Sequence, residues 1–214
     1  VEEWFHICGI ESMLKAQNPN LLESRVVDNT TFLLEILKEY KVKATFFILG
    51  SIAQKYPQLV KNINNSGHEI ASHGFSHVAI YRQGRIGFET DLNKSIEILR
   101  AITGKRILGF RAPDFSIGAS NRWAPDDLVA CGFSYDSSVV PTAFHDVYGM
   151  AGVPRGIFRW PNGLVEFPLP VIRVLGQNIP VGGGGYFRLY PLRVTLNYFQ
   201  REARRGSPRV FYIH

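Results

Sequence analysis

Two histidines four residues apart give the clearest chemical signal in the sequence. His73 and His77 begin and end the segment His-Gly-Phe-Ser-His. On one helical turn or in a tight loop, both imidazoles could face a single ion, and histidine pairs at this spacing often hold zinc. Two polar loop histidines would show the same spacing. The pair therefore indicates a metal site that needs at least one further ligand.

Two carboxylates at the start of the chain could supply that ligand. Glu2 and Glu3 follow Val1 in an apolar, strand-like opening segment. Two imidazoles with one carboxylate leave coordination positions open for water and substrate, which suits hydrolysis. Solvated charges at the end of a strand are the alternative for the two glutamates. The presence of the histidines favours ligation.

Apolar periodicity predicts helices and strands in alternation, and these elements must position the polar residues. A parallel sheet follows from this rhythm, and either a barrel-like closure or an open doubly wound sheet fits the chain length. Chemistry collects at the carboxyl ends of such strands. We expect residues 182–188, with four glycines, to form a flexible loop on the substrate side. The predicted helices are 28–40, 52–66, 87–102, 123–130 and 191–205, and the predicted strands are 44–49, 68–72, 107–111, 133–136 and 164–169.

Composition limits the remaining possibilities. The 214 residues are 45% hydrophobic, which predicts a single domain over residues 1–214, and both ends look truncated. The formal charge of +6 favours acidic partners, but the arginine run at 201–209 reads as a solvated helix face, and no nucleic-acid partner is expected. Neither a membrane-spanning run nor a signal peptide is visible, which favours the cytoplasm.

Ordered motifs along nearly the whole chain resemble the polysaccharide deacetylase (NodB-homology) family. Residues 45–50 and 67–77, with the two histidines, resemble its second motif. Phe-Arg-Ala-Pro at 110–113, Tyr-Asp-Ser-Ser at 135–138 and Tyr-Ile-His at 212–214 resemble its third, fourth and last motifs. The opening Val-Glu-Glu, the Gly-Gly-Gly-Tyr-Phe-Arg at 183–188 and the final motif are similar to deacetylases of exopolysaccharide loci that carry a C-terminal DUF3473 extension.

The resemblance implies a distorted (β/α) barrel with seven or eight parallel strands. It also implies a metal-dependent hydrolase that removes N-acetyl groups from an acetylated polysaccharide. Glu2, His73 and His77 take the positions of the metal ligands, with Glu3 as the fallback. The ligand types favour zinc, although cobalt, nickel or iron could use them. The family's catalytic base is an aspartate just before the segment seen here, and this sequence does not contain it.

Further roles follow from the chemistry of amide hydrolysis. His214 is the candidate acid that protonates the departing amine, and Asp136 could raise its pKa. Arg111 would orient the aspartate base, and a backbone N–H near Asp114 could stabilise the oxyanion. The family often has tyrosine at position 114 and a second aspartate near Val139, so this sequence departs from the pattern at both places.

Aromatic and apolar residues are candidates for a sugar-facing wall, because aromatic faces stack on pyranose rings. These residues are Trp160, Leu169, Tyr186 and Phe187. Two other functions fit the same motifs. One is a carbohydrate-binding protein without turnover, which metal content and acetate release would separate from an enzyme. The other is a hydrolase of non-sugar amides, which would accept small ligands in place of a polymer.

Overall fold

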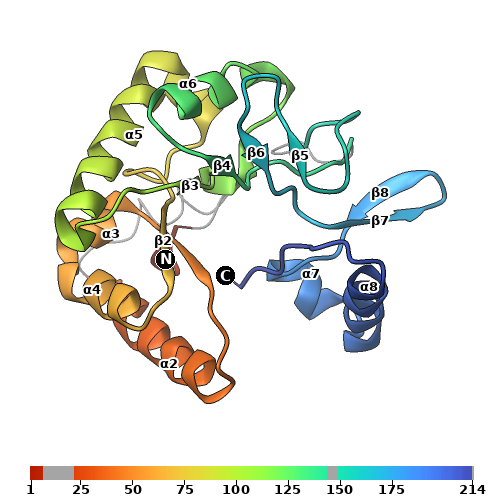
Figure 1. Ribbon diagram of the computed structural model, residues 1–214, viewed down its shortest axis with the longest axis horizontal. Coiled ribbons are helices and arrows are strands. Elements are labelled where there is room, and N and C mark those ends of the chain that lie inside the picture. The colour runs from red at the N-terminus through yellow and green to blue at the C-terminus, as the bar shows by residue number, and fades with distance from the viewer. Residues whose placement is uncertain (7–21, 144–148, 214) are drawn as a thin grey trace. The chain divides into compact units, whose positions relative to one another are not determined.

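The computed structural model describes residues 1–6, 22–143 and 149–213 (Figure 1). The chain divides into two compact units. Unit 1 comprises Val1–Val78 and Glu89–Ile107, and unit 2 comprises Ala79–Phe88 and Leu108–His214. Helix α5 (Ile80–Thr103) contributes to both, and Gly84 interrupts it with a φ of 67°. No helix among the described residues is long and apolar enough to span a membrane.

Unit 1 is built on two parallel strands. β1 pairs with β2 from Thr45↔Glu69 to Ile48↔Ser72, and side chains along β1 alternate between buried and half-buried. Its core contains fully buried side chains from β1, α4 and α5, which stabilise the strands by removing apolar surface from water. They include Ile48, Val60, Ile63, Leu92 and Leu99. The elements of unit 1 besides α5 are α2 (Val26–Glu39), β1 (Thr45–Ile48), α3 (Gly50–Lys55), α4 (Pro57–Asn65) and β2 (Glu69–Ser72).

One predicted helix of unit 1 is two helices in the structure. The sequence pattern predicts a continuous helix over 52–66, but α3 ends at Lys55 and α4 starts at Pro57. Proline lacks an amide hydrogen and suits the first helical position, so it starts a new helix here. The opening segment is likewise not a strand. It still runs beside β1, where the Leu49 N–H donates to the Val1 carbonyl at 3.3 Å.

Unit 2 contains a mostly parallel set of short strands. β3 pairs in parallel with β4, and β4 with β6, while β5 is antiparallel to β6. Strands β7 and β8 form an antiparallel hairpin that the sequence pattern did not predict. The parallel pairs agree with the predicted α/β class, but the described residues contain fewer than the predicted seven or eight parallel strands. The elements are β3 (Gly109–Phe110), α6 (Ala124–Ala130), β4 (Tyr135–Asp136), β5 (Phe158–Arg159), β6 (Val165–Glu166), β7 (Val171–Val174), β8 (Gln177–Pro180), α7 (Gly184–Leu189) and α8 (Leu192–Arg204).

The four glycines at 182–185 serve a different purpose from the predicted flexible loop. Gly183 forms a parallel bridge with Tyr212, and the Gly184 N–H donates to the Tyr212 carbonyl at 3.2 Å. A Cβ on Gly183 would lie 2.1 Å from that carbonyl oxygen, and φ is 136° there. Only glycine fits such a close approach of two backbones. Helix α7 then starts at Gly184, where the prediction had no helix.

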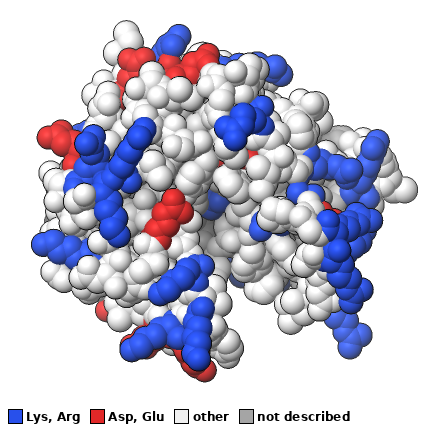
Figure 2. Space-filling model, in the orientation of Figure 1, with Lys and Arg blue, Asp and Glu red and all other residues white. Residues whose placement is uncertain are grey.

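Helices α7 and α8 lie side by side (Figure 1), and the segment that contains them, residues 182–213, carries most of the excess positive charge of the chain. Residues 182–213 contain six arginines and one glutamate: Arg188, Arg193, Arg201, Glu202, Arg204, Arg205 and Arg209. Figure 2 shows basic side chains gathered over this part of the molecule. Arg201, Arg204 and Arg205 are exposed, as predicted for a solvated helix face.

Candidate metal centre

Three side chains that the sequence analysis selected as metal ligands come together in unit 1. A carboxylate oxygen of Glu2 lies 2.7 Å from Nε2 of His77 and 3.5 Å from Nε2 of His73. One potential ligand atom from each of the three residues lies within 4.8 Å of the other two. All three side chains are at most 10% exposed. Donor atoms at these separations could surround one cation.

Local structure explains how residues so far apart in the sequence meet. His73 directly follows β2, and its N–H donates to the Ile48 carbonyl at the end of β1 at 3.0 Å. His77 ends the loop after β2 and has a φ of 55°, a backbone angle that residues other than glycine seldom adopt. Glu2 arrives from the other side, on the segment bound to the edge of β1. The cluster therefore sits at the carboxyl end of parallel strands, as predicted.

Electrostatics at the cluster favour a cation. Burial lowers the pKa of His73 to about 4, and this effect outweighs the opposing attraction of Glu2. The imidazole is therefore neutral at pH 7, which is the form that binds metals. A buried carboxylate beside a neutral imidazole is costly unless a positive charge compensates it. Two imidazole nitrogens and one carboxylate suit zinc and leave positions open for water. The donor set thus fits the metal that the sequence motifs imply.

Two other titratable residues follow Glu2 in the opening segment, Glu3 and His6. Glu3, the fallback ligand, is outside the cluster, because its carboxylate accepts hydrogen bonds from the Ser24 hydroxyl and from the Arg25 N–H at 3.2 Å. His6 was not selected from the sequence, yet its ring stacks on His77 at 5.4 Å. Burial, and then the proximity of His77, lowers the pKa of His6. In the sequence, the only indication that His6 lies near the cluster was its position close after Glu2.

Gly50, beside the loop, has no room for a side chain. An added Cβ on Gly50 would lie 2.8 Å from Cδ2 of Phe75 and 3.1 Å from the backbone Cα of Ser95. We expect Gly50→Ala to lower the free energy of unfolding by about 1–3 kcal/mol, the usual cost of overpacking. It should also weaken metal binding, because Phe75 lies between the two histidines. Denaturant titration and metal titration check both effects. Gly185→Ala is the control, since nothing lies within 4 Å of its added Cβ. Equal behaviour of the two variants would contradict this packing argument.

In unit 2, Arg111 is buried and holds the backbone of the fourth motif. Its Nε donates to the Ser137 carbonyl at 3.0 Å and its Nη2 to the Ser137 hydroxyl at 2.8 Å. The guanidinium also lies 5.5 Å from the ring of Phe115 and 5.7 Å from that of Tyr212. Burial lowers the pKa of Arg111 to about 10, so the group remains charged. These contacts anchor the motif, and orientation of a base by Arg111 stays a prediction.

Asp136 belongs to a buried pair of acids, and its partner, Glu166, was not predicted from the sequence. The two residues are register partners on β4 and β6, and both are fully buried. Burial raises the pKa of Asp136 to about 6 and that of Glu166 well above its usual value. Such a pair holds a proton more readily than an exposed carboxylate does. A glutamate inside the apolar run at 164–169 was the signal that could have identified it.

Donors around the pair hold it in place. The Ser138 hydroxyl donates to Asp136 at 2.5 Å. The Val139 N–H and the Trp160 indole N–H donate to Glu166 at 3.0 and 3.3 Å. Trp160, predicted to face the sugar, therefore has its N–H directed at a buried acid.

The remaining predicted site residues lie in different environments. Leu169 is 3% exposed and packs against Val140 and Val171, which favours a core role over sugar contact. Tyr186 stacks on Tyr190, and Phe187 is 38% exposed with its ring against Phe211. Asp114 lies in a 3-10 turn with a φ of 55°. His214, the candidate acid, lies outside the described residues. The roles of the last four residues stay predictions.

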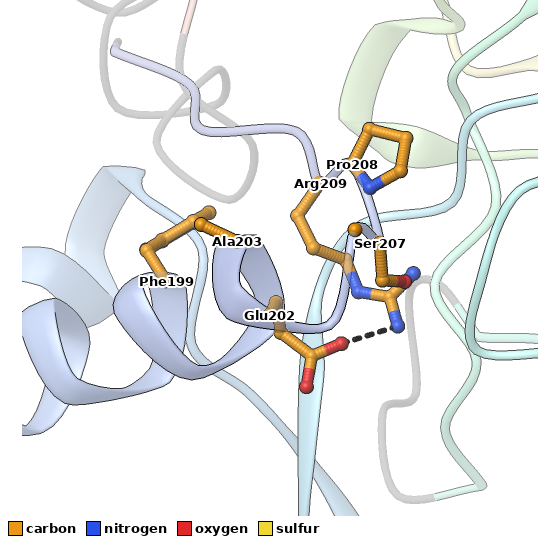
Figure 3. Close-up of a pocket in the computed structure, with 7 residues that line it drawn as sticks. Phe199, Glu202, Ala203, Ser207, Pro208 and Arg209 are labelled. Carbon is orange, nitrogen blue, oxygen red and sulfur yellow. Dashed lines mark hydrogen bonds and ion pairs between the residues drawn. The ribbon is translucent and has the colours of Figure 1, made fainter.

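A surface pocket at the end of α8 is not a second candidate site. Figure 3 shows Arg209 directed at Glu202 across this pocket. Their Nη2 and Oε2 atoms are 2.6 Å apart, so the carboxylate neutralises the guanidinium that could have attracted an anion. We conclude that this ion pair fastens the chain after α8 to the helix.

The fold and the cluster together define an α/β protein with a candidate metal centre, and comparison with known proteins supplies the family. Residues 22–134 match the polysaccharide deacetylase family, and residues 137–214 match a domain of unknown function, DUF3473. The first match covers more than half of the 214 residues. The chain therefore belongs to the polysaccharide deacetylase family, and the predicted DUF3473 segment is confirmed.

Individual relatives agree with this assignment. The peptidoglycan deacetylase of Helicobacter pylori is 31% identical over 120 residues, which is 56% of this chain and 40% of that protein. A peptidoglycan-N-acetylglucosamine deacetylase of Bacillus cereus is 40% identical over 75 residues, 35% of this chain and 27% of that protein. The chain thus spans less than half the length of each of these relatives.

A solved structure supports the fold. The crystal structure of a candidate polysaccharide deacetylase from Mycobacterium smegmatis has a TM-score of 0.64 and 26% identity. The likeness covers 86% of this chain and 63% of that one. Together with the parallel strand pairs, it confirms the α/β fold that the sequence predicts.

Proposed function

We propose that the protein is a metal-dependent polysaccharide N-deacetylase, with zinc as its metal and an N-acetylhexosamine polymer as its substrate. The observation that carries this proposal is the convergence of Glu2, His73 and His77 in a member of the polysaccharide deacetylase family. The names of its relatives support an acetylated glycan as the substrate class. The similarity of its motifs to those of exopolysaccharide-locus proteins favours an exopolysaccharide.

The residues of the cluster would hold the cation through two imidazole nitrogens and one carboxylate oxygen. A divalent metal supplies Lewis acidity, which polarises an amide carbonyl and lowers the pKa of a water molecule. The neutral state of His73 keeps its nitrogen available for a ligand bond at pH 7. The burial of all three side chains restricts competing water around the reacting groups and strengthens local electrostatic interactions.

Metal removal and acetate release test this proposal. The full natural protein is treated with a chelator to remove bound metal. It is then dialysed and reloaded with zinc. We expect acetate release from N-acetylglucosamine oligomers to fall by at least about 100-fold in the stripped protein and to return with zinc, because the metal activates both water and carbonyl. Bovine serum albumin carried through the same treatment controls for acetate contamination.

Each alternative function gives a different result in this experiment. A protein that binds zinc and oligomers but releases no acetate would be a carbohydrate-binding protein, and the proposal would be wrong. Acetate release from small non-sugar amides alone would also contradict it. Cobalt, nickel and iron, added in parallel to the stripped protein, identify the metal that gives the highest turnover.

A further inference from the structure

The loop that carries the two histidines is fastened by a side chain outside every recognised motif. Asp91, on α5, accepts hydrogen bonds from the N–H groups of Phe75 at 2.6 Å and Ser76 at 3.0 Å. The Ser76 hydroxyl donates to the same carboxylate. Phe75 and Ser76 are the two residues immediately before His77. One carboxylate therefore satisfies three donors in the middle of the loop.

Helix α3 fastens the opposite edge of the loop. The Gly50 N–H donates to the Gly74 carbonyl at 2.8 Å, and the Ser51 N–H donates to the Phe75 carbonyl at 3.2 Å. The loop is thus bound through its carbonyls on one side and through its amides on the other. Asp91 supplies the amide side.

A second contact between α5 and the loop lies one turn further along the helix. The hydroxyls of Ser72 and Ser95 are 2.8 Å apart, and the Ser72 oxygen accepts from the Gly74 N–H at 3.1 Å. Lys94 places its ammonium 3.6 Å from the centre of the Phe75 ring. These contacts leave the backbone between His73 and His77 little freedom. The left-handed conformation of His77 needs such support, because it is unfavourable in isolation.

We propose that Asp91 is a positioning residue of the metal centre: by holding the Phe75 and Ser76 amides, it fixes the separation of the His73 and His77 imidazoles before a metal binds. This inference rests on the proposed function. A carboxylate is needed because three donors converge on two oxygens with several lone pairs. An asparagine has one acceptor oxygen, and its NH₂ group would face N–H donors. Outer groups that orient metal ligands typically change metal affinity by about 10–100-fold when removed.

The test compares zinc affinity in Asp91→Asn and in a matched variant of the same helix. Glu97→Gln removes the same charge from an exposed position of α5 and leaves the loop untouched. Competition with a chromophoric chelator measures the zinc dissociation constant of each protein. We expect Asp91→Asn to raise this constant by about 10-fold or more and Glu97→Gln to change it by less than about 2-fold. The visible spectrum of the cobalt-loaded proteins should shift only for Asp91→Asn, because it reports ligand geometry.

The outcomes separate this inference from the proposed function. Unchanged zinc affinity and an unchanged cobalt spectrum in a folded Asp91→Asn protein would overturn the role of Asp91 and leave the metal centre intact. Failure of the unaltered protein to bind zinc or cobalt would overturn the metal centre and the inference with it. If Asp91→Asn does not fold, Ser76→Ala removes one of the three bonds, and a smaller loss of zinc affinity is expected. An affinity equal to that of the unaltered protein would then overturn the inference.

Discussion

Replacing His77 with alanine is expected to lower acetate release by at least about 100-fold and to abolish stoichiometric zinc binding. His77 offers the nitrogen nearest to the Glu2 carboxylate, at 2.7 Å. Without it, only one imidazole and one carboxylate remain, which is too few ligands for a stable protein zinc site. His73→Ala should behave in the same way, since its nitrogen lies 3.5 Å from the same oxygen. Zinc content by atomic emission and initial rates of acetate release measure both effects.

A third histidine provides the control for these two substitutions. His68 lies just before β2, and its Nδ1 accepts a hydrogen bond from the Ala44 N–H at 3.2 Å. Glutamine at this position can keep an acceptor for that N–H, so His68→Gln should retain zinc and turnover. Full zinc content and normal rates in both the His73→Ala and His77→Ala proteins would show that the cluster is not the metal centre.

The second large effect is expected at the buried acid pair of unit 2. Glu166→Ala should lower the free energy of unfolding by about 3 kcal/mol, because it leaves the Val139 and Trp160 donors buried without an acceptor and opens a cavity. Glu166→Gln should cost less. Its carbonyl can accept from the Val139 N–H, and its amide can donate to Asp136 in place of a carboxylic acid proton, so only the Trp160 N–H loses its acceptor.

The pH dependence of stability distinguishes a shared proton from simple packing. Asp136 has a folded-state pKa raised to about 6, and the pKa of Glu166 is raised as well, both chiefly by burial. The unfolded chain releases these protons at lower pH than the folded chain does. The contribution of the pair is therefore complete below about pH 4 and is lost as pH rises through the folded pKa values, by about 3 kcal/mol from the shift of Asp136 alone. Arg111 is the cation whose charge acts on both acids.

Glutamine at position 166 cannot ionise, so the stability of the Glu166→Gln protein should fall less with rising pH. Denaturant titrations at pH 5 and pH 8 should show that the free energy of unfolding of Glu166→Gln, relative to the unaltered protein, becomes more favourable at the higher pH. Subtracting the free energies of unfolding of the two proteins at each pH removes the contributions of all other acids. A Glu166→Gln protein that tracks the unaltered protein at both pH values would mean that Asp136 and Glu166 share no proton.

The sequence by itself determined the alternation of helices and strands and the three candidate metal ligands. Apolar periodicity is set by which side chains are buried, so α2, β1 and β2 appear close to their predicted ranges. The histidine spacing had chemical meaning because a loop of five residues at a strand end keeps both imidazoles near each other. Breaks between elements were harder to predict, as at Pro57, because an apolar stripe can continue across two helices.

Only the tertiary structure decided which distant groups meet. No local pattern connects Asp91 to the loop at 73–77, or Glu166 to Asp136, because each pair is brought together by the packing of separate elements. The same holds for Gly183, whose lack of a side chain accommodates the backbone of Tyr212. Sequence periodicity indicates whether a residue is buried. It does not indicate which residue packs against it, and the contacts named here depend on the identity of that partner residue.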